Sequence, residues 1–256
     1  MTQDGTDIQS AFERTVAEGE SRLKRSWPRL AATGMVGGLD VGFGAFALLI
    51  VKQATGNELL AALAFGVGFI ALTLANSELF TEDFLVPIVA LVAKRATVPE
   101  LIRLWGVTLV LNLAGGWLIM GLAMSGFPKL RPTAVEIGRH YVDIGVGWRS
   151  FSGALLGGAI ITLMTWMERS TPSVPAKLIA AVSIAFVLAA APLNHVIVVS
   201  LELFASLQAG APFGYFEWLE VAAWYTLGNL IGGIGLVTGL RLVQVGQGAI
   251  AAERPD

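Results

Sequence analysis

Hydrophobic positions in this chain form long unbroken runs. Charge-poor runs of about 20 residues recur at about 30–51, 97–124, 149–167 and 216–243, and each would cross a hydrocarbon core of roughly 30 Å as a helix. Two further runs, which begin near Leu59 and Pro175, contain polar residues in their middles. Membrane barrels show alternating segments of about ten residues instead. The pattern therefore predicts an all-α membrane protein with six transmembrane helices.

The interruptions in the second and fifth runs are the most informative features. The stretch LTLANSELFTEDFLVPIVALVA, residues 72–93, places Glu78, Glu82 and Asp83 between two apolar segments. The fifth run is interrupted at Pro192-Leu193-Asn194-His195. Broken helices are tolerated at membrane depth only where the freed backbone is buried in protein or lines a cavity. We therefore expect helices 2 and 5 to be broken and to face a pore.

The two halves of the chain share short motifs. Asn112-Leu113-Ala114-Gly115-Gly116 recurs 117 positions later as Asn229-Leu230-Ile231-Gly232-Gly233, and Asn76 lies 118 positions before Asn194. Each half has three spans, so the second half must be upside down relative to the first. The motifs predict an inverted 3+3 repeat with a transport pathway between its halves. The alternative is a chance match in which the glycine pairs only permit close helix packing.

The charge distribution predicts the boundaries and the orientation. Twelve of the 17 lysines and arginines fall on the side of the termini, so both termini are expected in the cytoplasm. The expected segments are a cytoplasmic amphipathic segment 1–28, a first repeat 29–124, a periplasmic connector 125–147, a second repeat 148–243 and a cytoplasmic tail 244–256. Ile8, Phe12 and Val16 have the spacing of a helix on the membrane surface, with a solvated tail as the alternative. In span 3, Thr97 and Glu100 fit a capping box.

Composition excludes most other classes of function. Charged residues make up 14% of the chain, against roughly a quarter in soluble domains. The absence of cysteine excludes disulfides and thiolate chemistry, and two histidines are too few for a clustered metal site. There is no G-x-S-x-G motif and no nucleic-acid module. The polar first 28 residues contain no signal peptide. We expect no enzyme, no cofactor and no metal.

Several motifs together resemble the formate/nitrite transporter (FNT) family. They are Ser77-Glu78-Leu79-Phe80-Thr81, Trp105 seven residues before Asn112, Trp166, His195, and Thr226-Leu227-Gly228-Asn229 followed by Gly232-Gly233. The resemblance covers nearly the whole chain and suggests a divergent, YfdC-like branch. It implies a homopentamer of aquaporin-like protomers in the bacterial inner membrane, each with its own pore for small monovalent anions or their weak acids.

The resemblance also implies roles for individual residues. It places Thr81, Asn194, His195 and Asn229 at the pore, between two hydrophobic constrictions. The outer constriction is formed by Phe65, Ile161 and Leu188, and the inner one by Phe69, Leu79 and Phe80.

Physical chemistry supports such an arrangement. An apolar slit strips water from an ion, which is costly unless a donor compensates or the charge is neutralised, and imidazole exchanges protons near physiological pH. The alternatives are that His195 only binds unwound carbonyls, that Phe65 and Phe69 pack the core, and that Asn112 and Asn229 link helices.

The chain departs from the family pattern at several places that bear on selectivity. Glu82-Asp83 follows the loop threonine, Gly158 stands where asparagine is usual, and no vestibule lysine is present near Val142. Asp40 replaces an aromatic residue; it is a candidate counter-charge for His195, partner for Arg149 or neutral carboxylic acid. The candidate selectivity residues are Asp40, Glu78, Glu82 and Asp83. A ring of carboxylates favours cations, so the alternative function is transport of a cation or a small neutral solute. The role of Glu202 stays open.

Overall fold

Helices form all the regular secondary structure in the part of the chain that the computed structural model describes, residues 3–255, with side chains from Ile8 onward. In chain order they are α1 (Gln3–Leu23), α2 (Trp27–Thr55), α3 (Glu58–Ala75), the 3₁₀ helix η1 (Phe80–Phe84), α4 (Val86–Val92), α5 (Val98–Gly126), the 3₁₀ helix η2 (Pro128–Leu130), α6 (Arg131–Ile144), α7 (Trp148–Arg169), α8 (Val174–Ala190), α9 (Val196–Gln208), α10 (Tyr215–Leu230), the π helix η3 (Ile231–Thr238), α11 (Gly239–Val245) and α12 (Gln247–Ala252).

Five of the described helical segments are long and apolar enough to cross a membrane. They are α2, α3, α5, α7 and the continuous segment Tyr215–Val245, which comprises α10, η3 and α11. The apolar helices α8 and α9 are shorter, with 17 and 13 residues. The architecture is therefore that of a helical membrane protein with five full-length apolar helices, one fewer than the six spans expected from sequence.

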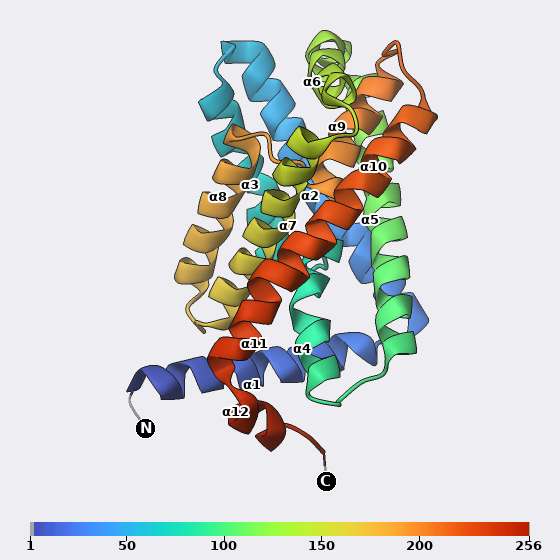
Figure 1. Cartoon of the computed structure of the whole chain (residues 1–256). Helices are drawn as coiled ribbons and strands as arrows, with labels where there is room; N and C mark the ends of the chain where they lie inside the picture. The colour runs from blue at the N-terminus through green and yellow to red at the C-terminus, as the bar shows by residue number, and fades with distance from the viewer. Residues whose placement is uncertain (1–2, 256) are drawn as a thin grey trace.

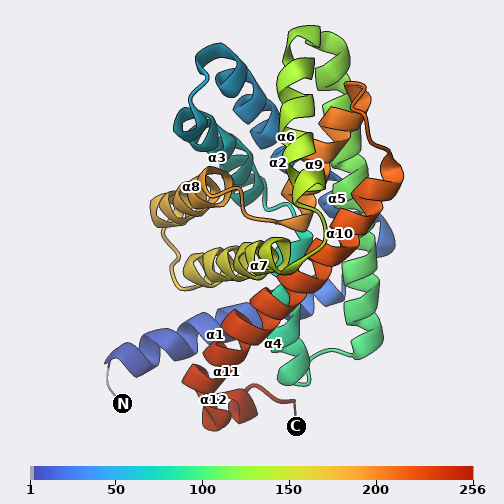
Figure 2. The same cartoon turned by 45° about the horizontal axis from the view of Figure 1, so that its top comes forward.

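The long helices form a bundle with a different cap at each end. In Figure 1, α6 lies at the upper end, and α1 crosses the lower end, where it packs against α4. Both ends of the chain lie on the α1 side in both views (Figures 1 and 2). Within the bundle, α2 packs against α3 and α5, and α7 packs against α10 and η3. The two ends are called the α6 side and the α1 side below.

Local sequence explains why α3 and α8 end where they do. Asn76 follows α3 in the left-handed conformation, with φ 52°, which asparagine tolerates better than most residues. The backbone stays non-helical to Leu79, and α4 begins with Pro87 in its first turn. On the other side, Pro192 follows α8, and His195 is the N-cap of α9. Polar residues and prolines thus interrupt the helical backbone after α3 and after α8.

The start of α5 shows a sequence prediction that the structure confirms. The backbone N–H of Thr97 donates to Glu100 Oε2 at 2.8 Å, and the Thr97 hydroxyl donates to the same oxygen at 2.7 Å. The carboxylate therefore satisfies a backbone N–H at the helix entrance that would otherwise lack a partner.

The amphipathic α1 does not use its apolar face as the sequence suggested. Phe12 and Val16 are buried against α4 and Trp166. Gly19 permits this packing, because a Cβ there would collide with the Val86 carbonyl and Ala90. The expectations of a membrane-surface helix and of a solvated tail are therefore both corrected. The helix is part of the packed structure.

The connector 125–147 is more ordered than its polarity suggested, because most of it forms α6. Ala134, Ile137 and Tyr141 recur at i, i+3 and i+7, a spacing that predicts one apolar face of a helix. This face packs on α9, where Gly138 fits directly against Ser206. The connector therefore covers one end of the bundle.

Candidate pore site

Thr81 and His195 lie 114 positions apart in sequence and touch in the structure. Thr81 belongs to η1, just after the non-helical stretch that follows α3, and His195 caps α9 after the stretch that follows α8. The distance from Thr81 Oγ1 to His195 Nε2 is 2.6 Å, and both side chains are fully buried. The two interrupted segments thus meet at a single buried hydrogen bond.

The hydrogen bonds of His195 define its protonation state. The backbone N–H of Val198 donates to His195 Nδ1 at 3.3 Å, so this nitrogen carries a lone pair. A neutral imidazole then has its proton on Nε2, which donates to Thr81 Oγ1. The hydroxyl proton of Thr81 stays available for a third group. A second proton on His195 would remove the acceptor that caps α9, so the arrangement favours the neutral ring.

Asn112 and Asn229 hold the two non-helical segments with the same set of hydrogen bonds. Asn112 Oδ1 accepts from the Phe80 N–H at 2.8 Å, and its Nδ2 donates to the carbonyls of Gly34 and Glu78 at 2.7 and 2.9 Å. Asn229 Oδ1 accepts from the Val196 N–H at 2.8 Å, and its Nδ2 donates to the carbonyls of Ala154 and Asn194 at 2.7 and 2.9 Å. Each amide therefore ties one loop to two helices.

These bonds correct the correspondence drawn between the halves. The residue equivalent to Asn194 is Glu78, 116 positions earlier, and not Asn76, because the carbonyls of Glu78 and Asn194 accept the matching bonds. The glycine pairs Gly37-Gly38 and Gly157-Gly158, 120 positions apart, add a further match. They contact the backbones of Glu78 and Asn112 in the first half and of Asn194 and Asn229 in the second. This repeated glycine pair was a sequence signal that we missed.

Asn194 and Asn229 were candidate substrate-binding residues, but their side-chain bonds are made to the backbone. Asn194 Nδ2 donates to the Ser150 carbonyl at 2.7 Å, and both polar atoms of Asn229 are engaged as described above. The structure thus favours the alternative that these asparagines link helices. Of the four candidate residues, Thr81 and His195 are the two whose side chains bond each other.

Gly158 allows α7 to cross α10 closely. A Cβ at this position would overlap the backbone of Asn229, which cannot move without separating the two helices. A side chain as large as asparagine therefore has no room at this position.

We predict that Gly158→Ala lowers the free energy of unfolding by about 1–3 kcal/mol, the usual cost of overpacking. Gly106→Ala is the matched control, because Gly106 lies on α5 and an added Cβ there would meet open space. That change is expected to be neutral or to stabilise by up to about 1 kcal/mol. Denaturant unfolding in detergent measures both, and equal effects would contradict the assigned crossing.

The six residues expected at the constrictions all belong to one buried apolar cluster. Their exposed fractions are at most 3%, and the set is Phe65, Phe69, Leu79, Phe80, Ile161 and Leu188. The rings of Phe65 and Phe69 lie 5.4 Å apart. Phe80 packs edge-on against Phe84 at 5.0 Å. His195 is itself fully buried.

The carboxylates on both sides of the loop threonine contact arginines at and just beyond the end of α1. Arg22 Nη1 lies 3.1 Å from Asp83 Oδ1, 3.4 Å from Glu78 Oε1 and 3.5 Å from Glu82 Oε2. Arg25 pairs with Glu78 as well. All three carboxylates are buried. They do not form an open acidic ring, so the reason for expecting an acidic entrance on the α1 side does not hold.

Asp40 has a partner that the sequence did not suggest. Its Oδ2 accepts a hydrogen bond from the Ser77 hydroxyl at 2.5 Å. Among the described residues it makes no ion pair with Arg149 or His195 within 4.0 Å. Asp40 therefore fixes the loop after α3 to α2, in keeping with the interpretation of a helix contact.

Sequence analysis missed several residues that position η1. Arg22 and Arg25 were counted only as positive charges of the N-terminal segment. Thr238, in the π helix η3, donates to the Phe84 carbonyl at 2.6 Å, and the Trp105 indole donates to the Asp83 carbonyl at 3.1 Å. Residue spacing could not predict either contact, because the two partners are separated by 154 positions in one case and 22 in the other.

Polar cavities lie on both sides of the buried pair. The cavity on the α1 side has a volume of about 220 Å³ and is lined by Arg22, Arg25, Arg29, Arg169, Glu18, Glu82 and Glu168, among others. The cavity on the α6 side has about 380 Å³ and is lined by Lys52, Glu58, Glu136, His140, Tyr141 and Glu202, together with apolar residues that include Pro192. Each cavity approaches one of the interrupted segments.

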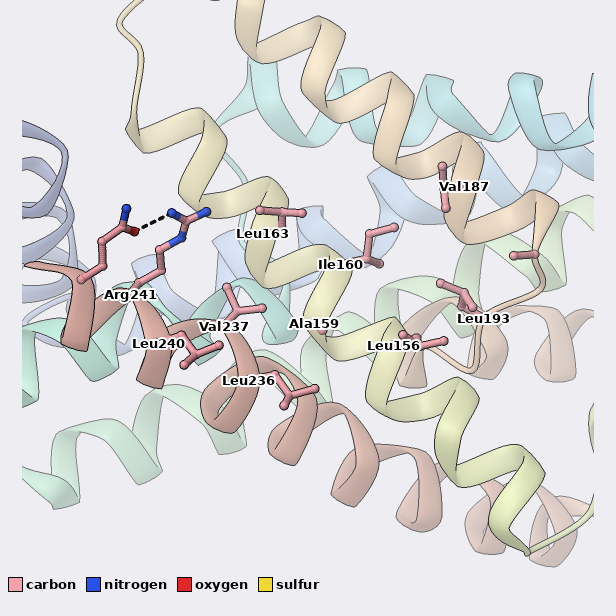
Figure 3. A pocket seen from close by; sticks show the side chains of 12 residues that line it. Leu156, Ala159, Ile160, Leu163, Val187, Leu193, Leu236, Val237, Leu240 and Arg241 are labelled. Atoms are coloured by element: carbon pink, nitrogen blue, oxygen red, sulfur yellow. Dashed lines mark hydrogen bonds between the residues drawn. The ribbon is translucent and has the colours of Figure 1, made fainter. Parts of the chain in front are cut away.

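A further cavity is an apolar groove whose lining includes neither Thr81 nor His195. Its volume is about 580 Å³, and it lies between α7, α8 and the η3–α11 segment (Figure 3). Leucine, isoleucine, valine and alanine side chains line it, and the polar exceptions are Arg241 and Gln244 at one end, joined by a 2.7 Å hydrogen bond. Its chemistry suits an apolar surface and not a path for ions.

The fold and the buried site define a membrane channel or transporter. A sequence model of the formate/nitrite transporter family matches residues 9–243, and the chain belongs to this family, whose members are channels and not enzymes. Similar proteins include the inner membrane protein YfdC of Escherichia coli K12, with 27% identity over 85% of this chain and 71% of YfdC. The formate channel BtFdhC of Bacillus thuringiensis is 23% identical over 88% of this chain and 90% of BtFdhC.

Solved structures show the same fold. An FNT family ion channel superposes with a TM-score of 0.76 at 17% identity, covering 89% of this chain and 96% of the channel. A pentameric formate channel with formate bound gives a TM-score of 0.68 at 19% identity, covering 84% and 97%. The resemblance inferred from the motifs is thus confirmed at the level of family and fold.

Proposed function

We propose that this protein conducts small monovalent anions, or their weak acids, through a pore centred on Thr81 and His195. The observation that carries the proposal is the buried hydrogen bond between these residues, where the two interrupted segments meet inside an apolar cluster. A threonine hydroxyl whose proton is free and an imidazole that can take a proton are suited to a weak acid that sheds its water in a narrow passage. Formate and nitrite are the test substrates.

The architecture behind this proposal is a six-span protomer. In it, α3 with η1 and α4 forms one broken span, and α8 with α9 forms another. The equivalent roles of Asn112 and Asn229 support an inverted 3+3 repeat. The likeness to a pentameric channel supports a homopentamer with one pore per protomer. The likeness to an inner membrane protein, with the positive charges near the termini, supports the bacterial inner membrane with both termini in the cytoplasm.

Anion transport is favoured over the cation alternative by the ion pairs of the loop. The alternative rested on uncompensated carboxylates at Glu78, Glu82 and Asp83, and Arg22 lies within 3.5 Å of all three. Arg25 pairs with Glu78 as well, so two guanidinium charges offset most of the negative charge of the three carboxylates. The six apolar residues around Thr81 and His195 are proposed as the constrictions.

His195→Asn in proteoliposomes tests the proposed function. Asparagine is a good N-cap and keeps α9 capped, but it cannot exchange a proton near neutral pH. Losing a hydrogen bond to a charged group costs about 1.5–3 kcal/mol, so formate uptake is expected to fall by about ten- to a hundredfold. Thr81→Val, which removes only the hydroxyl, is expected to reduce uptake similarly.

Thr226→Val is the control, since the Thr226 hydroxyl only donates to the Ala222 carbonyl of its own helix. It should keep wild-type flux. Wild-type vesicles that take up neither formate nor nitrite, or that pass monovalent cations instead, would overturn the proposal.

A further inference from the structure

The α6-side cavity contains a buried carboxyl group that nothing in the proposed pore mechanism uses. Glu202 lines this cavity, yet its exposed fraction is only 6%. Its Oε2 atom is buried and has no hydrogen-bond partner among the described residues. A buried polar oxygen without a partner is costly, so its persistence at a cavity wall points to a ligand or a proton there.

The surroundings of Glu202 favour the neutral carboxyl. The one ammonium group of the cavity, Lys52, is held by Glu58 at 3.0 Å and Glu136 at 3.2 Å. No described cation lies within 4.0 Å of Glu202 itself. An unpaired buried carboxylate is unfavourable, so the group is best accommodated with its proton.

Tyr141 adds a hydroxyl beside the carboxyl. It lies on α6, outside the long apolar helices, and is buried next to Glu202. Burial and then the neighbouring Glu202 carboxyl raise the pKa of Tyr141 well above its ordinary value, so it stays protonated and can donate. A second tyrosine hydroxyl, that of Tyr225 on α10, lies near Tyr141, is also buried and has no hydrogen-bond partner among the described residues.

The charged and titratable groups around Glu202 come from every element packed at this cavity. They are Lys52 from α2, Glu58 from α3, Glu136, His140 and Tyr141 from α6, and Tyr225 from α10. These side chains can exchange protons with water in the cavity.

The position of Glu202 connects the cavity to the pore. It follows His195 by seven residues on α9, which returns it to nearly the same helix face at about 10 Å along the axis. Pro192, in the non-helical stretch before His195, lines the same cavity. Leu188, one of the proposed constriction residues, precedes the cavity residues Ala189 and Ala190. A solute in this cavity thus lies just before the apolar passage.

We propose that Glu202 is the proton-exchange group of the α6-side cavity, which converts an entering weak-acid anion to its neutral acid before it passes toward His195. The inference rests on the proposed function and names the form in which the substrate crosses. In this step the O–H bond of the Glu202 carboxyl breaks and an O–H bond forms on the anion. Glu202 is left as a carboxylate and recovers a proton from water in the cavity. The reverse step returns a proton when the acid leaves.

Glu202→Gln tests the proposal in proteoliposomes that contain a lumenal pH dye. Glutamine keeps the shape and can accept from Tyr141, but it cannot give up a proton. Formate uptake below neutral pH is expected to fall by about a hundredfold, the lower end of the range for a lost proton-transfer group, and to stop rising as the pH falls. Glu220→Gln is the matched control: Glu220 is an exposed carboxylate on α10 outside the cavity lining and should keep the wild-type profile.

Tyr141→Phe provides a second measurement should the Glu202 variant fail to assemble. The hydroxyl stabilises the ionised carboxylate, so its loss should move the midpoint of the uptake profile to higher pH. Wild-type pH profiles in both variants would overturn the inference. The proposed function would survive that result if His195→Asn still lowered uptake by the expected factor, whereas wild-type protein without weak-acid uptake would overturn both.

Discussion

Replacing Arg22 with methionine is expected to lower the free energy of unfolding by about 3–5 kcal/mol, the cost of leaving buried charges without their partner. Arg22 is 3% exposed and is the cation nearest to Asp83 and Glu82, and it bonds Glu18 at 2.9 Å. Burial alone would lower the pKa of Arg22, but the carboxylates of Glu78, Asp83 and Glu82 raise it well above its ordinary value. The guanidinium is therefore charged at every accessible pH.

Denaturant unfolding in detergent, with flux assays on the surviving protein, measures this effect. Lys24→Met is the matched control. Lys24 lies two residues after Arg22 and pairs with Glu20 at 2.5 Å, but its side chain is 57% exposed. An exposed pair contributes about 0–1 kcal/mol. The triple variant Arg22→Met, Glu82→Gln, Asp83→Asn should regain part of the loss, because fewer buried charges remain. Equal stability of the Arg22 and Lys24 variants would contradict the role given to this cluster.

Asn229→Asp is expected to be as damaging as Asn229→Ala, although it changes a single atom. The Nδ2 group of Asn229 donates to the carbonyls of Ala154 and Asn194, and in aspartate a carboxylate oxygen would face both carbonyls. Each buried group left unpaired costs about 1–3 kcal/mol, so a loss of several kcal/mol is expected. The same argument applies to Asn112, with the carbonyls of Gly34 and Glu78.

Two measurements separate loop positioning from general destabilisation. Thermal unfolding should show both Asn229 variants well below wild type, while Thr226→Ala on the same helix stays close to it. Formate flux at a temperature where the variants remain folded should also fall, because the bonds of Asn229 flank His195 on both sides, at Asn194 and Val196. Normal flux in a folded Asn229→Asp protein would show that the loop does not depend on this amide.

The hydrophobic pattern was sufficient for some features and not for others. Runs of apolar residues located the long helices, and the polar stretches at Asn76 and Asn194 fell where α3 and α8 end. Thr97 and Glu100 formed the expected cap because both partners lie within one helical turn. The alignment of the two loops was wrong by two residues, with Asn76 in place of Glu78 opposite Asn194. The repeated motif aligns helix α5 with α10, but it does not align the loops that Asn112 and Asn229 bind. The amphipathic α1 was misassigned because its spacing shows an apolar face and not what covers that face.

The sequence by itself determined that the protein is a helical membrane protein and where its apolar runs are interrupted, because these follow from local composition and spacing. The tertiary structure alone decided that Thr81 reaches His195, that Arg22 pairs with the loop carboxylates and that Glu202 lies at a cavity wall. Such contacts join residues dozens to more than a hundred positions apart. They depend on how closely the helices cross, and that distance is set by backbone contacts at glycines such as Gly38 and Gly158.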